Sequence, residues 1–240
     1  MWSSDVAYDR FMGRFSTLLA PLFADFAGIE SGQRVLDVGA GTGALTAELV
    51  RRGAETAAAE PAAAFVAALH ERFPSVDARE APAESLPWPD DSFDAALAQL
   101  VVSFMRDAPA GVREMRRVAD TVAVCMWDRE GMEMLAAINR ARGALGAIPQ
   151  DAAYRTRGEI EGLLGEGAEM ELLEVDAGYV DFEDFWDALL GGAGPAGAWA
   201  TSLEGEQRTE ARAELFRQLG EPDGPFTMTG RAWAARIRRA

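Results

Sequence analysis

The sequence predicts an α/β fold in which a mostly parallel sheet carries helices on both faces. Between residues 35 and 127, short apolar runs typical of strands alternate with amphipathic helical segments, and such alternation implies right-handed crossovers between parallel strands. A glycine-rich loop at residues 39–43 directly follows the first run, which favours a ligand at the carboxyl ends of the strands. The 240 residues, 49% of them hydrophobic, suffice for one large domain with a single core.

The elements of this core follow from apolar periodicity and from helix start and stop signals. The predicted strands are residues 35–38, 56–60, 76–79, 93–99 and 121–127. The predicted helices between them are residues 42–52, 62–72 and 112–118. The first helix places Leu45 and Leu49 on one face, and Gly53 follows its end.

The flanking segments are predicted to be mainly helical. The N-terminal segment carries an apolar stripe at helical spacing, which consists of Leu18, Leu19, Leu22, Phe23 and Phe26. After residue 127 we expect helices at 132–145 and at 156–164, the second capped by Thr156 with Glu159 three residues on, and then a strand within 170–182.

A glycine-rich stretch at residues 191–197 interrupts the C-terminal part. It follows an apolar helical stripe formed by Phe185, Trp186, Leu189 and Leu190, and a charged helix extends from it to residue 219. Two interpretations remain open: an insertion that closes over a ligand, or a flexible connection. The last segment, residues 226–237, is predicted as a strand.

The glycine loop is accompanied by an acid that restricts the ligand. Gly39, Gly41 and Gly43 permit close approach of the backbone, and Gly39, Gly41 and Ala44 satisfy a relaxed dinucleotide fingerprint. Asp37 would repel a pyrophosphate, and no basic residue lies within 37–50 to compensate. We therefore expect a nucleoside ligand with a cationic, amino-acid-like end.

Two linked motifs resemble a known family. Residues 35–43, Val-Leu-Asp-Val-Gly-Ala-Gly-Thr-Gly, are similar to the first motif of the class I S-adenosylmethionine-dependent methyltransferases. Residues 83–94 resemble a stretch of the small-molecule methyltransferases related to the ubiquinone and menaquinone enzymes. Glu60, 21 residues after Gly39, stands where the family binds the ribose hydroxyls, and Pro61 after it is expected to open a helix. The resemblance covers about residues 30–128.

The resemblance implies a Rossmann-like sheet of seven strands in the order 3-2-1-4-5-7-6, with a final antiparallel strand, an N-terminal helical lid and a helical insertion at about 183–222. The chain is then one methyltransferase domain, 1–240, divided into an N-terminal segment 1–30, a cofactor-binding core 31–128 and a substrate-side half 129–240. The implied cofactor is S-adenosyl-L-methionine, with S-adenosyl-L-homocysteine as product. Its predicted contacts are Asp37, Gly39, Ala40, Gly41, Gly43, Glu60, Pro61, Ala83, Glu84, Gln99 and Leu100.

Two residues of the expected lid are further candidates, because Tyr8 or Arg14 could hold the carboxylate of the cofactor. A helix cap and a surface charge are the equally open alternative. The chain also departs from the family pattern twice. Pro82 stands where relatives carry an Asp that accepts from adenine, and a Pro-Gly-Gly turn is missing at residues 118–121. Adenine would then depend on backbone groups near Ala83 and Glu84, or on another acceptor.

Methyl transfer from a sulfonium is an in-line displacement that depends mainly on positioning, so no catalytic residue is assigned. An aromatic pocket suits a cation whose charge is lost in the step. The acceptor-side candidates are Ser103, Phe104, Trp127, Tyr154, Trp186 and Trp199, although core packing explains each aromatic residue as well. His70, the single histidine, is expected to face solvent, and any general base is unassigned.

Composition restricts partners and location. With 23 basic and 39 acidic residues, the net charge is −16, which disfavours nucleic acid. Cys125 is expected in the core, no Cys/His cluster suggests a metal, and no apolar span or signal pattern is present. We expect a cytoplasmic monomer or homodimer that acts on a small molecule without a membrane. A nicotinamide oxidoreductase and a non-catalytic cofactor-binding protein are the alternatives.

Overall fold

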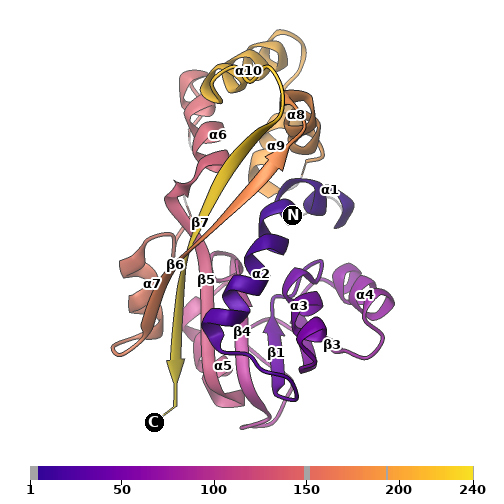
Figure 1. The fold of residues 1–240 in the computed structure, drawn as a ribbon, viewed down its shortest axis with the longest axis vertical. Helices are drawn as coiled ribbons and strands as arrows, with labels where there is room; N and C mark the ends of the chain where they lie inside the picture. The colour runs from indigo at the N-terminus through magenta and orange to yellow at the C-terminus, as the bar shows by residue number, and fades with distance from the viewer. Residues whose placement is uncertain (1–4, 149–151, 193, 240) are drawn as a thin grey trace. The chain divides into compact units, whose positions relative to one another are not determined.

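The structure is a computed structural model that describes residues 5–148, 152–192 and 194–239. It contains a seven-stranded sheet in the order β3-β2-β1-β4-β5-β7-β6 (Figure 1). The predicted fold class and strand order are confirmed. The strands are β1 (Arg34–Val38), β2 (Glu55–Glu60), β3 (Asp77–Glu80), β4 (Phe93–Gln99), β5 (Ala119–Met132), β6 (Glu169–Tyr179) and β7 (Phe226–Arg238).

The first five strands pair in parallel. β1 lies between β2 and β4, so that Asp37 is opposite Ala58 on one side and Leu97 on the other. β3 pairs with β2, and β5 pairs with β4. Figure 1 shows β7 running in the opposite direction to β6. The carboxyl ends of β1, β2 and β4 therefore lie at one edge of the sheet, next to the glycine loop.

Helices lie before, between and after these strands. They are α1 (Asp5–Phe11), α2 (Gly13–Ala27), α3 (Ala44–Arg52), α4 (Ala63–Arg72), the 3-10 turn η1 (Val102–Phe104), α5 (Ala108–Val118), α6 (Glu133–Ala144), α7 (Arg157–Leu164), α8 (Phe182–Leu190), α9 (Gly194–Ser202) and α10 (Gly205–Gln218).

The chain divides into two compact units. We call Ser16–Asp128, Ala153–Leu173 and Ala232–Ala240 the core unit, and Met1–Phe15, Arg129–Ala152 and Glu174–Arg231 the second unit. The boundary after Asp128 coincides with the sequence-based division at residue 128, whereas no boundary falls at residue 30. That the chain acts as one domain stays a prediction.

In the core unit, β1 and β4 are almost completely buried: Val35, Leu36, Val38 and Leu97 are each 0% exposed. Arg52 of α3 joins the N-terminal helix to this core, because it pairs with Asp25 at 2.7 Å and donates to Pro21 O at 2.9 Å. The second unit has an aromatic core instead. Tyr179 stacks on Phe226 with ring centroids 5.2 Å apart and meets Phe185 edge-on.

Several predicted boundaries were wrong for local reasons. α4 begins at Ala63 with Ala62 as its N-cap, so Pro61 precedes the helix and does not open it. The predicted strand to residue 182 ends at Tyr179, because Asp181 caps α8 by accepting from Asp184 N. The glycine-rich stretch is partly helical, since Gly194, Pro195 and Gly197 lie in α9.

The N-terminal apolar stripe was also partly wrong. α2 buries Leu19 and Phe23, whereas Leu18 is 44% and Leu22 is 37% exposed. The buried face of α2 therefore contains fewer large side chains than the sequence indicated. Small residues such as Ala20 occupy other positions on this face. Other expectations are confirmed: Thr156 caps α7 by accepting from Glu159 N at 3.3 Å.

Candidate functional site

The three loop glycines differ in what surrounds the position of a Cβ atom. All three have positive φ: +73° at Gly39, +54° at Gly41 and +87° at Gly43. A Cβ on Gly39 would lie 2.4 Å from Val101 Cγ2, and a Cβ on Gly43 would lie 2.7 Å from Phe73 Cε2. A Cβ on Gly41 would have only Gly39 O, at 4.0 Å, within van der Waals contact among the described residues. Only Gly41 therefore borders open space, where a ligand can approach the backbone.

Asp37 is held inside the core unit by helix α3. The side chain is 1% exposed, and Oδ2 accepts from Thr46 Oγ1 at 2.6 Å. Burial raises the pKa of Asp37 to about 7; hydrogen bonds from the Thr46 hydroxyl and backbone amide oppose the rise, and the nearby charge of Glu60 adds to it. Because the α3 N-cap is Gly43, which has no capping side chain, the Asp37 carboxyl satisfies the helix terminus in its place.

Glu60, at the end of β2, connects the glycine loop to the next helix. Its Oε2 accepts from Gly41 N and its Oε1 from Ala62 N, both at 3.0 Å. The residue is 7% exposed, and burial raises its carboxyl pKa while these two amide bonds oppose the rise. Each oxygen retains a lone pair, so the carboxylate is oriented to accept from a hydroxyl group beside Gly41.

The start of the second motif lies next to Glu60, because Ala81 N donates to Glu60 O at 3.1 Å. Pro82 is exposed, and its carbonyl accepts from Ser85 N in a tight turn. The Glu84 carboxylate accepts from Asp107 N at 3.0 Å, ahead of α5. Glu84 is thus engaged at a helix terminus, and Ala83 is 8% exposed.

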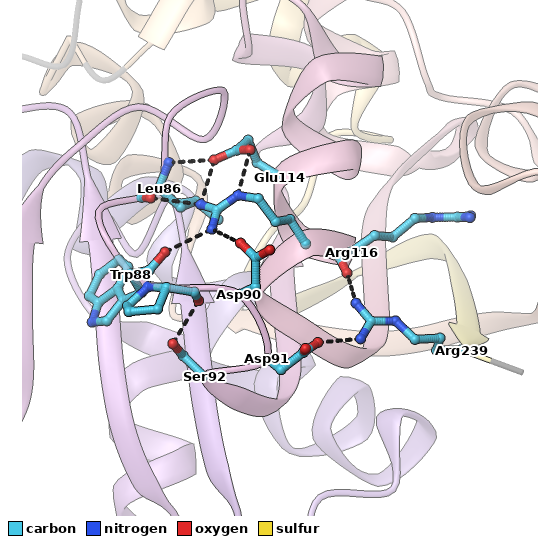
Figure 2. A network of polar contacts seen from close by, with 10 residues as sticks. Leu86, Trp88, Asp90, Asp91, Ser92, Glu114, Arg116 and Arg239 are labelled. Atoms are coloured by element: carbon cyan, nitrogen blue, oxygen red, sulfur yellow. Dashed lines mark hydrogen bonds and ion pairs between the residues drawn. The ribbon is translucent and has the colours of Figure 1, made fainter.

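The rest of the second motif forms a clamp around Arg117 of α5, which we call the Arg117 clamp: residues 86–92 with Glu114 and Arg117. Arg117 donates to Leu86 O and Trp88 O at 2.9 Å and pairs with Asp90 and Glu114 (Figure 2). These carboxylates raise the pKa of Arg117, and the guanidinium lowers the pKa of Glu114. The clamp fastens the loop to α5 and leaves its charges neutralised.

Figure 2 also shows Asp91 bonded to Arg239, which donates to Arg116 O as well. Trp88 packs edge-on against Phe93 with centroids 5.6 Å apart. The acidic residues of this loop are thus occupied by arginines. No group of metal-ligating side chains occurs within the described residues.

The end of β4 supplies Gln99 and Leu100. Gln99 Nε2 donates to Ser16 O of α2 at 3.0 Å, and Gln99 Oε1 is buried without a hydrogen-bond partner among the described residues. Leu100 has φ +62°, and its amide donates to Cys125 O. A positive φ on a non-glycine residue marks a constrained turn, here immediately after the strand that neighbours Asp37.

The two lid candidates lie in the second unit. Arg14 Nη1 donates to Gly178 O at 3.0 Å and to Asp184 Oδ2 at 2.8 Å, and its guanidinium lies 4.7 Å from the Tyr179 ring centroid. The arginine lowers the pKa of Asp184. Arg14 thus anchors α2 to α8 within this unit, and Tyr8 is half-buried in α1. Their contact with a cofactor stays a prediction.

The acceptor-side candidates separate by burial. Trp127 is 2% and Trp186 is 5% exposed, so both pack in the cores of their own units. Phe104 is 52% exposed, while Tyr154 and Trp199 are half-buried. Ser103 donates its hydroxyl to Ala153 O. His70 is exposed on α4 and Cys125 is buried, with the pKa of its thiol raised by burial, as expected.

Thr46 is the site residue that sequence reasoning missed. Its signal was a polar residue between Leu45 and Leu49 on the face of α3 that packs on the sheet, where all three are buried. The described residues that come together at the sheet edge are Asp37, Gly41, Glu60, Ala83 and Gln99.

The strand order and the glycine loop define a Rossmann-like protein with the methyltransferase fold. A putative type II methyltransferase from Anaeromyxobacter dehalogenans has this fold, with a TM-score of 0.66 at 22% identity over 91% of this chain and 95% of that one. Residues 36–124 match the family described as methyltransferase domain. This match covers the segment that carries most of the first motif and all of the second.

Curated relatives match parts of the chain. An uncharacterized protein of Mycobacterium tuberculosis is 32% identical over 159 residues, which are 62% of this chain and 58% of the relative. The demethylmenaquinone methyltransferase of Mycobacterium marinum is 40% identical over 90 residues, 38% of each protein. The chain thus spans less than two thirds of the relatives that it matches. No helix in the described ranges is long and apolar enough to cross a membrane.

Proposed function

We propose that this protein transfers a methyl group from S-adenosylmethionine to a small-molecule acceptor. The observation that carries the proposal is Glu60: a buried carboxylate at the end of β2, oriented by Gly41 N and Ala62 N, beside the one loop glycine that borders open space. Such an acid accepts from ribose hydroxyls. The methyltransferase domain match over residues 36–124 supports the same reading.

The residues present fit this cofactor. Glu60 would hold the ribose, and Gly41 would let the backbone approach the amino-acid end. The adenine would lie against Ala83 and Glu84, where Pro82 supplies no acceptor and backbone groups take its place. Gln99 Oε1, buried and without a partner among the described residues, would accept from an ammonium group at the end of β4.

When bound, S-adenosylmethionine supplies an electrophilic methyl group. The chain positions the acceptor in line with it and excludes water, which is the main source of rate acceleration in such a displacement. Asp37 contributes through its charge and by holding α3 and the loop in place, because Thr46 engages its carboxyl directly. Ser103, Phe104 and Tyr154 are the acceptor-side residues of the core unit that we retain, since each has some exposure.

Calorimetric titration with S-adenosylmethionine, S-adenosylhomocysteine and NADH tests the proposal. We expect both adenosyl ligands to bind and NADH not to bind. Binding of NADH alone would favour a nicotinamide oxidoreductase, and the proposal would then be wrong. A labelled-methyl assay against a metabolite extract tests transfer: if cofactor binds but no label is transferred to any component, a non-catalytic binding protein is the better description.

Substitution of Glu60 tests the ribose contact. Glu60→Ala should weaken S-adenosylhomocysteine binding by about 1 to 3 kcal/mol, the range for a hydrogen bond to a charged group, and Asp37→Asn should weaken it by a similar amount. Glu80→Ala is the matched control, because Glu80 lies opposite Glu60 in the β2–β3 register and is exposed. Normal binding by both site variants would contradict the site assignment while leaving the fold intact.

A further inference from the structure

Arg142 is a buried arginine with few partners, in the last turn of α6 in the second unit. It is 8% exposed. Its Nη2 donates to Ile148 O at 3.1 Å, and its guanidinium carbon lies 5.5 Å from the ring centroid of Trp199 on α9. Its Nε is buried and has no hydrogen-bond partner in the described chain. Among the described residues, no carboxylate pairs with it.

Three other well-covered arginines of the described chain have different partners. Arg155, 6% exposed, donates to Trp127 O at 3.2 Å and to Asp128 O at 3.1 Å. Arg52 pairs with Glu48 and Asp25, and its side chain is 15% exposed. Arg236, with a side chain 16% exposed, pairs with Glu169. Among these four arginines, Arg142 alone combines a buried Nε that has no hydrogen-bond partner with the lack of a carboxylate partner in the described chain.

Burying a guanidinium without a counter-ion is costly, because the charge loses its hydration and the donors lose their acceptors. Burial accordingly lowers the pKa of Arg142. The negative end of the α6 dipole compensates only in part. A structural role in closing the helix end uses one of five N–H groups, that bonded to Ile148 O. The remaining donors form a fork that matches a carboxylate or a phosphate.

We propose that Arg142 and Trp199 form a binding site for the anionic group, a carboxylate or a phosphate, of a small molecule. Arg142 would bind the anion through its free donors, and the half-buried Trp199 ring would cover the apolar part of the molecule beside it. Anion binding itself does not depend on methyl transfer.

Thermal unfolding in the presence of defined anions tests the site. Benzoate is the carboxylate probe, inorganic phosphate is the second arm, and benzamide and chloride at matched ionic strength are the neutral and ionic controls. At about ten times its Kd, a bound probe should raise Tm by about 3 to 5 °C in a chain of this size. We expect this rise with benzoate if a carboxylate is the ligand and with phosphate if a phosphate is.

Matched variants assign the effect to the residue. Arg142→Gln should lose the rise, and Arg142→Lys should retain a smaller one because a point charge replaces the fork. Arg140→Gln removes the same charge from the same helix, but Arg140 is exposed and bonded to Gln218, so its rise should equal that of the wild type. If Arg142→Gln does not fold, hydrogen exchange of the wild type is measured instead. Addition of the probe should then slow amide exchange in residues 133–148.

Two results would overturn the proposal: no rise in Tm and no slowing of exchange with either anion in the wild type, or an undiminished rise in Arg142→Gln. Failure here is distinct from failure of the proposed function. Adenosyl ligands bind or fail to bind in calorimetry irrespective of Arg142, and anion protection can persist in a protein that binds no adenosyl ligand.

Discussion

The glycine loop and the Arg117 clamp both carry the family resemblance, but they use their polar groups in opposite ways. At the loop, Asp37 and Glu60 are buried acids whose carboxyl pKa values are raised. At the clamp, the Glu114 carboxyl pKa is lowered, and Arg117 makes ion pairs with Asp90 and Glu114. The loop acids therefore accept hydrogen bonds from neutral donors, whereas the clamp pairs acids with an arginine.

This difference indicates that the glycine loop binds a ligand, whereas the Arg117 clamp stabilises the fold. An acid with a raised pKa in a buried position gains from a cationic ligand, which favours its ionised form. A saturated ion-pair network has no such gain available and contributes to stability instead. Three predictions follow from the contrast, the largest expected effect first.

Asp37 should make stability depend on pH. Its pKa rises from 3.8 to about 7 on folding, so between these values the folded chain binds more protons than the unfolded chain. The free energy of unfolding should therefore fall as pH rises from about 4 to about 7, by about 3 kcal/mol from this residue. Urea unfolding of wild type and Asp37→Asn at pH 4.5 and 8 measures it.

The free energy of unfolding of Asp37→Asn should not show this fall, because asparagine cannot ionise. The stability of the variant relative to the wild type should therefore be about 3 kcal/mol higher at pH 8 than at pH 4.5. Only the difference between the two proteins is informative, since Glu60 adds to the trend and acids with lowered pKa values, such as Glu114, oppose it. If the free energy of unfolding changed equally with pH in both proteins, the pKa of Asp37 would not be raised on folding, and the prediction would be wrong.

Gly43→Ala and Gly41→Ala should separate packing from ligand approach inside the loop. The Gly43 Cβ would clash with Phe73 and Leu69 at 2.7 and 2.9 Å, so with its φ strain the variant should lose about 2 to 4 kcal/mol of stability. Gly41→Ala carries φ strain alone and should lose about 1 kcal/mol. Gly41→Ala should nevertheless lower the affinity for S-adenosylhomocysteine at least tenfold, because the added Cβ occupies the space where the ligand approaches the backbone. Equal losses of stability would remove the distinction between the two glycines.

Much of the core unit was predictable because its signals are local. The β4 bounds, the Thr156 cap and the buried position of Cys125 follow from periodicity and residue type in a short window. The sequence could not indicate contacts between residues that are apart in the chain, such as Thr46 with Asp37 across nine positions. Nor could it indicate that Arg142 Nε is buried without a partner among the described residues. A charged residue in a helical pattern is expected to be exposed, so Arg142 gave no signal of burial.

The smallest change in the free energy of unfolding is expected for Arg117→Lys in the Arg117 clamp. This variant also tests most directly whether the clamp differs from the glycine loop. Lysine keeps the charge but cannot reach Leu86 O, Trp88 O and both acids with one planar group, so we expect a loss of about 1 to 2 kcal/mol in urea unfolding. Arg113→Lys, on the exposed face of the same helix, should be neutral. S-adenosylhomocysteine affinity should change less than twofold in both, because the clamp's polar groups bind one another. A tenfold loss of affinity in Arg117→Lys with unchanged stability would place the clamp in the binding site and end the distinction between the two motifs.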